Sequence, residues 1–231
     1  PDPTPAYLLR ASFLARTLPK ARAMLVVIDL NGTLLFRPSR NHPTKFVERP
    51  HARRFLEYCI ATFYVVIWSS ARPQNVNNMC RQLLSPDQQQ RVVDVWARDR
   101  FGLTAADYST RTQCYKRLTK LWADPVVAAS HPDAGAGSGA WNQGNTVLID
   151  DSIEKARSEP FNAITIPEFN GDINEQPTVL PLVHDYLNTL AHQADISTYI
   201  RSHPFAVDEE ASVLLQHSDS NDELGNAAQN N

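Results

Sequence analysis

The chain has 231 residues, which is enough for one sizeable hydrophobic core. Apolar residues make up 42% of it and charged residues 20%, the composition of an ordinary soluble globular protein. The formal net charge of -3 argues against a strongly basic nucleic-acid surface, and no apolar run approaches the ~20 residues that a membrane span requires.

Five short segments predict the strands of a sheet. Their apolar positions run without alternation, which is typical of strands covered on both faces. Stretches with helical spacing lie between them, so the pattern predicts a Rossmann-like α/β fold, with a parallel sheet and helices on both faces. The predicted strands are Met24–Leu30, Tyr64–Ser69, Val92–Ala97, Thr146–Asp150 and Ala163–Ile166. The predicted helices are Arg49–Phe63, Pro73–Ser85, Cys114–Asp124, Thr178–Gln193 and Ile196–Ser202.

The rest of the chain divides around this α/β pattern. We expect an N-terminal helical extension over residues 1–23, the α/β domain over 24–205 and a polar, disordered tail over 206–231. The small polar residues of Ala129–Asn145 predict a flexible surface loop inside the domain. The first residues, PDPTPAY, lack an initiator Met and indicate a piece excised from a longer protein.

The number and spacing of the cysteines indicate a reducing compartment. Cys59, Cys80 and Cys114 are odd in number and far apart, with no Cys-x-x-Cys pair. This argues against disulfides and zinc, and favours a reducing, intracellular location in the nucleus or cytoplasm.

Polar residues gather at the carboxyl ends of the predicted strands, where α/β sheets bind ligands. Asp29 ends an apolar run before a glycine turn, so it can act as a nucleophile or as a ligand of a hard cation such as Mg²⁺. The pair Asp150–Asp151 needs a cation to offset its repulsion. The hydroxyl of Ser69 and the ammonium of Lys116 complete the donors that a phosphate group requires.

Each feature alone has an ordinary explanation. Two aspartates after a strand often cap a helix, and a single lysine is usually a solvated surface residue. Their occurrence together, in order and at strand ends, favours a catalytic or binding site over a purely structural α/β domain.

Four motifs carry a resemblance to a known family. "DLNGTL" resembles the DxDGT signature of the haloacid dehalogenase superfamily of phosphatases, and "VIWSSA", "YKRL" and "VLIDDS" resemble its second, third and fourth motifs. "RPHARRFLEYC" is similar to the branch that contains the RNA polymerase II C-terminal-domain phosphatases, the small C-terminal-domain phosphatases and the Dullard-type enzymes. The similarity runs from about Leu25 to Phe169.

The resemblance implies a role for each site residue. Asp29 would be the nucleophile that attacks phosphorus and forms an aspartyl-phosphate intermediate. Mg²⁺ would be held by Asp29, by the backbone carbonyl of Asn31 and by Asp151. Ser69 and Lys116 would bind the transferring phosphoryl group.

Two further residues would support this set. Asp150 would orient the waters of the metal or Lys116, and Thr33 would brace the motif loop by hydrogen bonding. Phosphoryl transfer mostly needs positioning and charge neutralisation, and the combined set supplies both.

Asn31 departs from the pattern, in which a second aspartate protonates the leaving alkoxide and then activates water. An amide cannot exchange that proton, so we expect this chain to be severely impaired as an enzyme. Either the protein is a natural pseudophosphatase, or an aspartate was replaced deliberately. Deliberate replacement is favoured, because the change is nearly isosteric and the other catalytic positions are intact.

The spacing of the motifs predicts an open site without a large cap domain. Asp29 and Ser69 are only 40 positions apart, which leaves room for a helix and a short flap, and Ser85–Cys114 predicts one strand and little else. An open groove suits a macromolecular phosphate, and the branch implies phosphoserine or phosphothreonine in a protein segment.

Basic residues could form a rim that contacts groups flanking the phosphate. A solvated rim is the ordinary alternative for them. Phosphorylated nucleic-acid ends are a second possible substrate, against which the mild acidity counts. A phosphopeptide-binding module without turnover is a further alternative. The candidate rim residues are Arg37, Arg40, Lys45 and Arg72.

Overall fold

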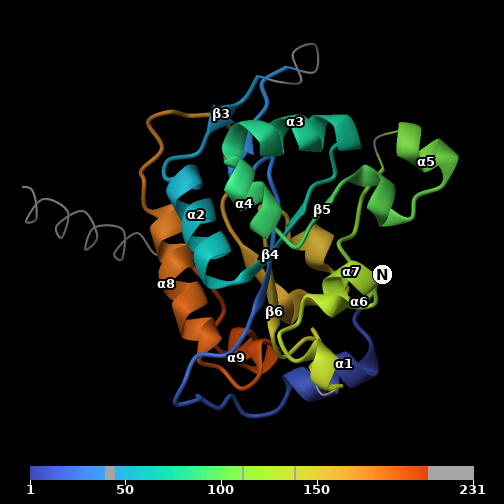
Figure 1. Ribbon diagram of the computed structural model, residues 1–231, viewed down its shortest axis with the longest axis vertical. Coiled ribbons are helices and arrows are strands. Elements are labelled where there is room, and N and C mark those ends of the chain that lie inside the picture. Colours follow the sequence, from blue (N-terminus) through green and yellow to red (C-terminus); the bar gives the residue numbers. More distant parts are fainter. Residues whose placement is uncertain (40–44, 111, 138, 208–231) are drawn as a thin grey trace, which may run out of the picture.

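The computed structural model describes residues 1–39, 45–110, 112–137 and 139–207. Its centre is a parallel sheet of five strands in the order β5-β4-β1-β6-β7 (Figure 1). The five strands are β1 (Leu25–Ile28), β4 (Tyr64–Trp68), β5 (Asp94–Trp96), β6 (Thr146–Asp150) and β7 (Ala163–Thr165). Each lies within a predicted strand, so the parallel α/β sheet is confirmed. The chain first builds outward from β1 to β5 and then crosses to β6, which places the topological switch point beside β1.

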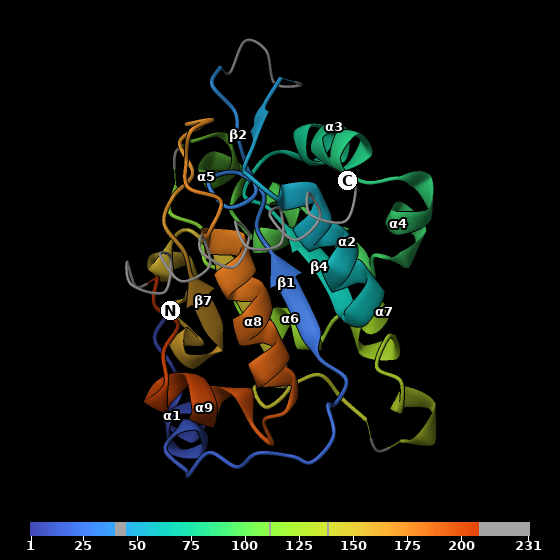
Figure 2. The same ribbon diagram turned by 90° about the vertical axis from the view of Figure 1, so that its left-hand side faces the viewer.

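Helices cover both faces of the sheet (Figures 1 and 2). On one face lie α2 (Ala52–Thr62), α3 (Pro73–Leu83) and α8 (Val179–Ala191), and on the other α6 (Leu118–Trp122) and α7 (Pro125–Ala129). Successive side chains of β1 alternate between the two cores: Val26 and Ile28 belong to one, Leu25 and Val27 to the other. All four are fully buried, which explains the unbroken apolar run in the sequence.

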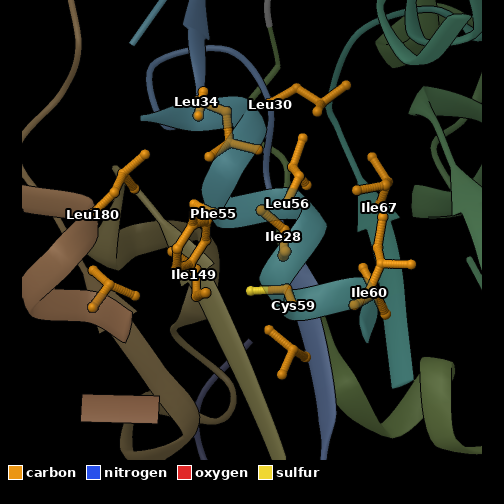
Figure 3. Close-up of a cluster of buried hydrophobic side chains, with 14 of the residues drawn as sticks. Ile28, Leu30, Leu34, Phe55, Leu56, Cys59, Ile60, Ile67, Ile149 and Leu180 are labelled. Carbon is orange, nitrogen blue, oxygen red and sulfur yellow. The ribbon is translucent and has the colours of Figure 1, made fainter. Parts of the chain in front are cut away.

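Helix α2 holds the strand ends from one side (Figure 3). Its apolar stripe, including Phe55, Leu56 and Cys59, is buried against β1 and neighbouring strands. Truncating a buried Leu or Phe to Ala typically costs about 2–5 kcal/mol, so this packing fixes β1 firmly. The helix begins three residues later than predicted, because His51 adopts a left-handed conformation with φ of 67°.

The segment between the second and third motifs holds more structure than predicted. We expected one strand there, but α4 (Pro86–Arg91), a 3-10 turn at Arg98–Phe101 and α5 (Ala105–Ser109) flank β5. Their short lengths and polar faces leave no apolar periodicity to detect.

The predicted flap contains an antiparallel hairpin, β2 (Leu35–Phe36) and β3 (Val47–Glu48). None of these insertions is a large cap domain within the described residues.

The prediction of a helix over Cys114–Asp124 is wrong for its first half. Helix α6 begins only at Leu118, and Arg117 before it is extended, with φ of -73° and ψ of 102°. The amide of Lys116 donates to the carbonyl of Lys155 at 2.7 Å, which holds this stretch beside the end of β6. An extended backbone here carries the lysine side chain into the core.

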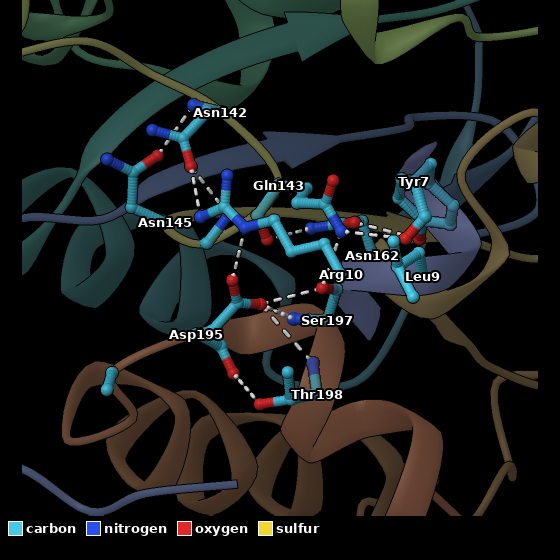
Figure 4. Close-up of polar contacts among 12 residues, drawn as sticks. Tyr7, Leu9, Arg10, Asn142, Gln143, Asn145, Asn162, Asp195, Ser197 and Thr198 are labelled. Atoms are coloured by element: carbon cyan, nitrogen blue, oxygen red, sulfur yellow. Dashed lines mark hydrogen bonds and ion pairs between the residues drawn. The ribbon is translucent and has the colours of Figure 1, made fainter. Parts of the chain in front are cut away.

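The N-terminal segment is tied to the domain by helix α1 (Pro5–Ala11), which packs against α9 (Ile196–Ser202) (Figure 4). The Tyr7 hydroxyl donates to Asn162 Oδ1 at 2.9 Å, and Arg10 Nε pairs with Asp195 Oδ2 at 2.7 Å. The predicted surface loop 129–145 is only partly at the surface, because Trp141 is 3% exposed and packs into the core. The small, polar residues around Trp141 led to the prediction of a surface loop, so its buried position was missed.

All three cysteines are free and buried. In the described part of the chain, no helix is both long and apolar enough to cross a bilayer. The predicted tail lies outside the described residues from 208 onward, and the domain boundaries stay predictions.

Candidate functional site

The site begins with strand register. Ile28 of β1 pairs with Ile149 of β6, so Asp29 and Asp150 lie side by side at the carboxyl edge of the sheet. The Asp29 amide donates to the Ile149 carbonyl at 3.0 Å, which fixes this alignment. Both aspartates are 1% exposed, and Ser69, which follows β4 at the same edge, is equally buried.

Lys116 supplies the counter-charge between the two strands. Its Nζ lies 2.7 Å from Asp29 Oδ1 and 2.6 Å from Asp150 Oδ2, and the side chain is fully buried. Buried charges are tolerated only when they are paired and hydrogen-bonded, as they are here. The structure therefore brings together three residues that the sequence had placed on separate motifs.

Lys155 is a second cation at the site that the sequence reasoning missed. Its Nζ lies 2.8 Å from Asp150 Oδ1, 3.1 Å from Asp151 Oδ1 and 3.4 Å from Asp29 Oδ2. It belongs to a 3-10 turn at Ile153–Ala156, directly after the fourth motif. Its spacing of four residues from Asp151 was the available signal, since one helical turn brings such a pair together.

Burial and neighbouring charges shift the pKa values of Asp150 and Asp151 in opposite directions. Burial opposes the charged form of Asp150, but Lys116 and Lys155 outweigh it and hold the pKa of Asp150 below its ordinary value. For Asp151, burial dominates, and with repulsion from Asp29 and Asp150 it raises the pKa to about 6 despite the nearby Lys155. Burial works against the charge of Lys155, yet the three carboxylates raise its pKa.

The loop after β1 has little room. Gly32 has φ of +87°, and an added Cβ would lie 2.7 Å from Asp151 Oδ2. Glycine is therefore required for both backbone conformation and space. Thr33 Oγ1 lies 3.5 Å from Asp29 Oδ2, a long hydrogen bond that agrees with the expected bracing role. The amide of Arg37 donates to Asn31 Oδ1 at 3.1 Å, so the amide side chain of Asn31 is held in place.

The buried side chain of Arg49 supports the loop after β1. Arg49, which is 2% exposed, donates to the Thr33 carbonyl at 3.1 Å and pairs through two nitrogens with Glu175 at 2.8 Å. Its guanidinium carbon lies 5.6 Å from the centre of the Phe169 ring. The Phe169 amide in turn donates to the Gly32 carbonyl at 2.7 Å. These contacts join the loop after β1 to the segment that follows β7.

The acidic residues fit a divalent cation. Asp29, Asp150 and Asp151 each offer a carboxylate oxygen, and these atoms lie within 4.8 Å of one another. Oxygen donors from carboxylates are the ligands that Mg²⁺ prefers. The three groups could therefore hold a divalent cation, and two of them, Asp29 and Asp151, belong to the predicted set of Mg²⁺ ligands.

A cleft of about 720 Å³ opens beside Asn31. Arg37 and Arg72 of the predicted rim line it, together with Arg98 and Tyr108, which the sequence reasoning missed. Lys45 is exposed and does not line this cleft. Arg40 lies outside the described residues.

The fold and the cluster at the strand ends define a Rossmann-like α/β protein with an aspartate and lysine site. Residues 24–197 match the family model of the NLI interacting factor-like phosphatases. The chain is 30% identical over 236 residues to an uncharacterized FCP1 homology domain-containing protein of Schizosaccharomyces pombe, a match that covers 96% of this chain and 94% of the relative. The chain belongs to the NLI interacting factor-like phosphatase family, which confirms the resemblance seen in the motifs.

Two solved structures are similar at much lower levels. Fission yeast RNA polymerase II CTD phosphatase Fcp1, as an R271A variant bound to beryllium fluoride, is 12% identical, with 90% of this chain and 67% of that chain covered and a TM-score of 0.42. CbbY from Rhodobacter sphaeroides, in complex with phosphate, is 11% identical, with 67% and 90% covered and a TM-score of 0.42. Likenesses this distant carry no weight for the function of this chain.

Proposed function

We propose that this chain is a Mg²⁺-dependent phosphoserine or phosphothreonine protein phosphatase that uses Asp29 as nucleophile, in a form weakened by Asn31. The observation that carries the proposal is the buried Asp29–Lys116–Asp150 arrangement at the switch point of the sheet. Membership of a phosphatase family supports the reaction class. Buried free thiols support a nuclear or cytoplasmic location.

The chain's own residues supply most of the chemistry. A carboxylate oxygen of Asp29 forms a bond to phosphorus while the bond to the serine or threonine oxygen breaks. Lys116 offsets negative charge on the phosphoryl oxygens, and the Ser69 hydroxyl donates to one of them. Asp29, the Asn31 carbonyl and Asp151 would hold Mg²⁺, which would supply further charge neutralisation. Asp150 positions Lys116.

Asn31 limits both halves of this reaction. The leaving alkoxide needs a proton, and the water that hydrolyses the aspartyl-phosphate must lose one. An amide does neither, and a positioned acid or base is typically worth ~10²–10⁴-fold in rate. Asn31 Oδ1 accepts a hydrogen bond from the Arg37 amide, and a carboxylate oxygen of an aspartate could accept the same bond.

The test compares the chain with its Asn31→Asp variant on phosphoserine peptides and p-nitrophenyl phosphate, with and without Mg²⁺. We expect Mg²⁺-dependent phosphate release from the variant, at ~10²–10⁴ times the rate of the parent. Turnover in neither protein, with Mg²⁺ binding shown by calorimetry, would favour a pseudophosphatase that binds a phosphopeptide. The same outcome would also fit an enzyme whose substrate lies outside the panel.

A further inference from the structure

The cleft beside Asn31 has an unusual charge balance. Three arginines line it, and none of its described lining residues is acidic. The remaining lining is mostly small hydroxyl and amide side chains. Because Asn31 is itself part of the lining, the cleft opens directly onto the proposed reaction site.

Arg37 is the least compensated of the three. Its guanidinium is half-buried, and burial lowers its pKa. Within the described part of the chain no carboxylate acts on its charge, and its Nε is buried without a hydrogen-bond partner. A buried donor of this kind costs free energy until an acceptor meets it.

Arg98 and Tyr108 also line the cleft. Arg98 donates to the backbone carbonyls of Asp107, Tyr108 and Thr110 at 2.8–2.9 Å, which holds the segment after α5 in place. These bonds leave its positive charge unneutralised. The guanidinium carbons of Arg72 and Arg98 each lie 5.9 Å from the centre of the Tyr108 ring, so both cations are held near the same ring.

We propose that this cleft binds a second phosphate group of the substrate, so that the preferred substrate is a protein segment carrying two nearby phosphorylated residues. Arg37 and Arg72 would donate to the second phosphate, while Arg98 adds long-range attraction. Planar guanidinium groups match phosphate oxygens through paired hydrogen bonds. The inference rests on the proposed function, because it places the first phosphate at Asp29.

The features of the cleft favour a phosphoprotein over a nucleic acid. Tyr108 is the only aromatic residue among the described lining, and its ring is already engaged by two arginines. A nucleic-acid end would therefore find no free ring on which to stack a base. The net charge of -3 also disfavours a long polyanion, whereas a local patch suffices for one extra phosphate.

The test measures peptide binding by fluorescence anisotropy with the full chain. The probes are a singly phosphorylated serine peptide and a panel with a second phosphoserine one to four residues before or after the first. We expect at least one doubly phosphorylated peptide to bind ~10-fold more tightly than the single one, and Arg72→Gln and Arg37→Gln to remove that preference. The matched control is Arg81→Gln, exposed on α3 and outside the cleft, which should keep it.

Binding and turnover separate the two proposals. A preference that depends on Arg37 and Arg72, without turnover even in Asn31→Asp, would support the cleft and refute the phosphatase. Turnover by Asn31→Asp with equal binding of both peptide classes would overturn the cleft alone. Tighter binding of a 5′-phosphorylated oligonucleotide than of every doubly phosphorylated peptide would also overturn it.

Discussion

Two neighbouring regions handle charge in opposite ways. At the strand ends, three carboxylates and two ammonium groups contact one another at 2.6–3.4 Å, and each charge has an internal partner. In the adjacent cleft, three guanidinium groups have no carboxylate among the described lining residues. The first region is organised without a ligand, and the second retains positive charge that an anionic ligand can neutralise.

The difference shows how stability and binding are divided in this fold. A paired buried network contributes to stability only while both signs are present. A cation without a carboxylate partner gains no ion-pair energy in the folded chain and keeps its attraction for an anion. Removing a cation should therefore be costly to the fold in the first region and costly mainly to binding in the second.

The largest effect should come from removing the nucleophile. In the Asn31→Asp background, Asp29→Asn should reduce phosphate release from p-nitrophenyl phosphate at least ~10⁴-fold, because no other carboxylate can form the intermediate. Asp99→Asn, which changes an exposed aspartate, is the control and should keep full activity. Activity of the Asp29→Asn variant within tenfold of its parent would contradict the assignment.

Lys116→Met should destabilise the charge network at the strand ends by removing one of its two cations. It leaves Asp29 and Asp150 buried beside each other with one cation fewer, and such losses cost about 3–5 kcal/mol in the free energy of unfolding. Urea denaturation at pH 7 with EDTA measures this. The cost should shrink in acid, where neutral carboxyl groups need no counter-charge. Lys20→Met, at an exposed position, provides the baseline.

Asp151→Asn should change the free energy of unfolding in the opposite direction and stabilise the fold. Its carboxyl pKa is raised to about 6, so the folded state binds this proton more tightly than the unfolded chain, and stability is lost as the pH rises through 6. Without metal at pH 7, the amide should therefore stabilise the fold by about 1–2 kcal/mol, after allowance for partial solvent screening. The gain should vanish near pH 4.

Added Mg²⁺ makes that comparison sharper. The parent chain should gain thermal stability with millimolar Mg²⁺, and Asp151→Asn should lose most of that gain because one carboxylate ligand is missing. An equal Mg²⁺ response in both proteins would place the metal elsewhere.

The smallest effect on stability should come from Arg37→Met. The methionine fills similar space without a desolvated charge, so the free energy of unfolding should stay within about 0.5 kcal/mol or rise slightly. The measurement is urea denaturation beside Arg54→Met, an exposed control on α2. A loss comparable to that of Lys116→Met would show that an anion or acid already compensates Arg37.

The sequence predicted the parts of the site that local patterns encode. Apolar runs located the strands, and the residues that end them, Asp29, Ser69 and Asp150, necessarily share one edge of a parallel sheet. Lys116 was identified through its motif, although its helical setting was wrong, because burial between two aspartates overrode local helix propensity.

The missed residues depend on tertiary contacts. Lys155 reaches three carboxylates on two different strand ends, and its spacing of four residues from Asp151 signals only one of these contacts. Arg98 acts by holding a segment ten residues later, which no periodicity reveals. The cleft likewise arises from four separated segments, so only the folded chain brings its cations together.

Arg49 has a consequence for how the chain tolerates cleavage. Phe169 and Glu175, on either side of an exposed stretch, both contact this one buried guanidinium. A protease cut between Asn170 and Asn174 would therefore leave the two new ends anchored to the same point. The nicked protein should stay assembled on a sizing column and retain the geometry around Gly32, since the Phe169 amide that braces it lies on the anchored side.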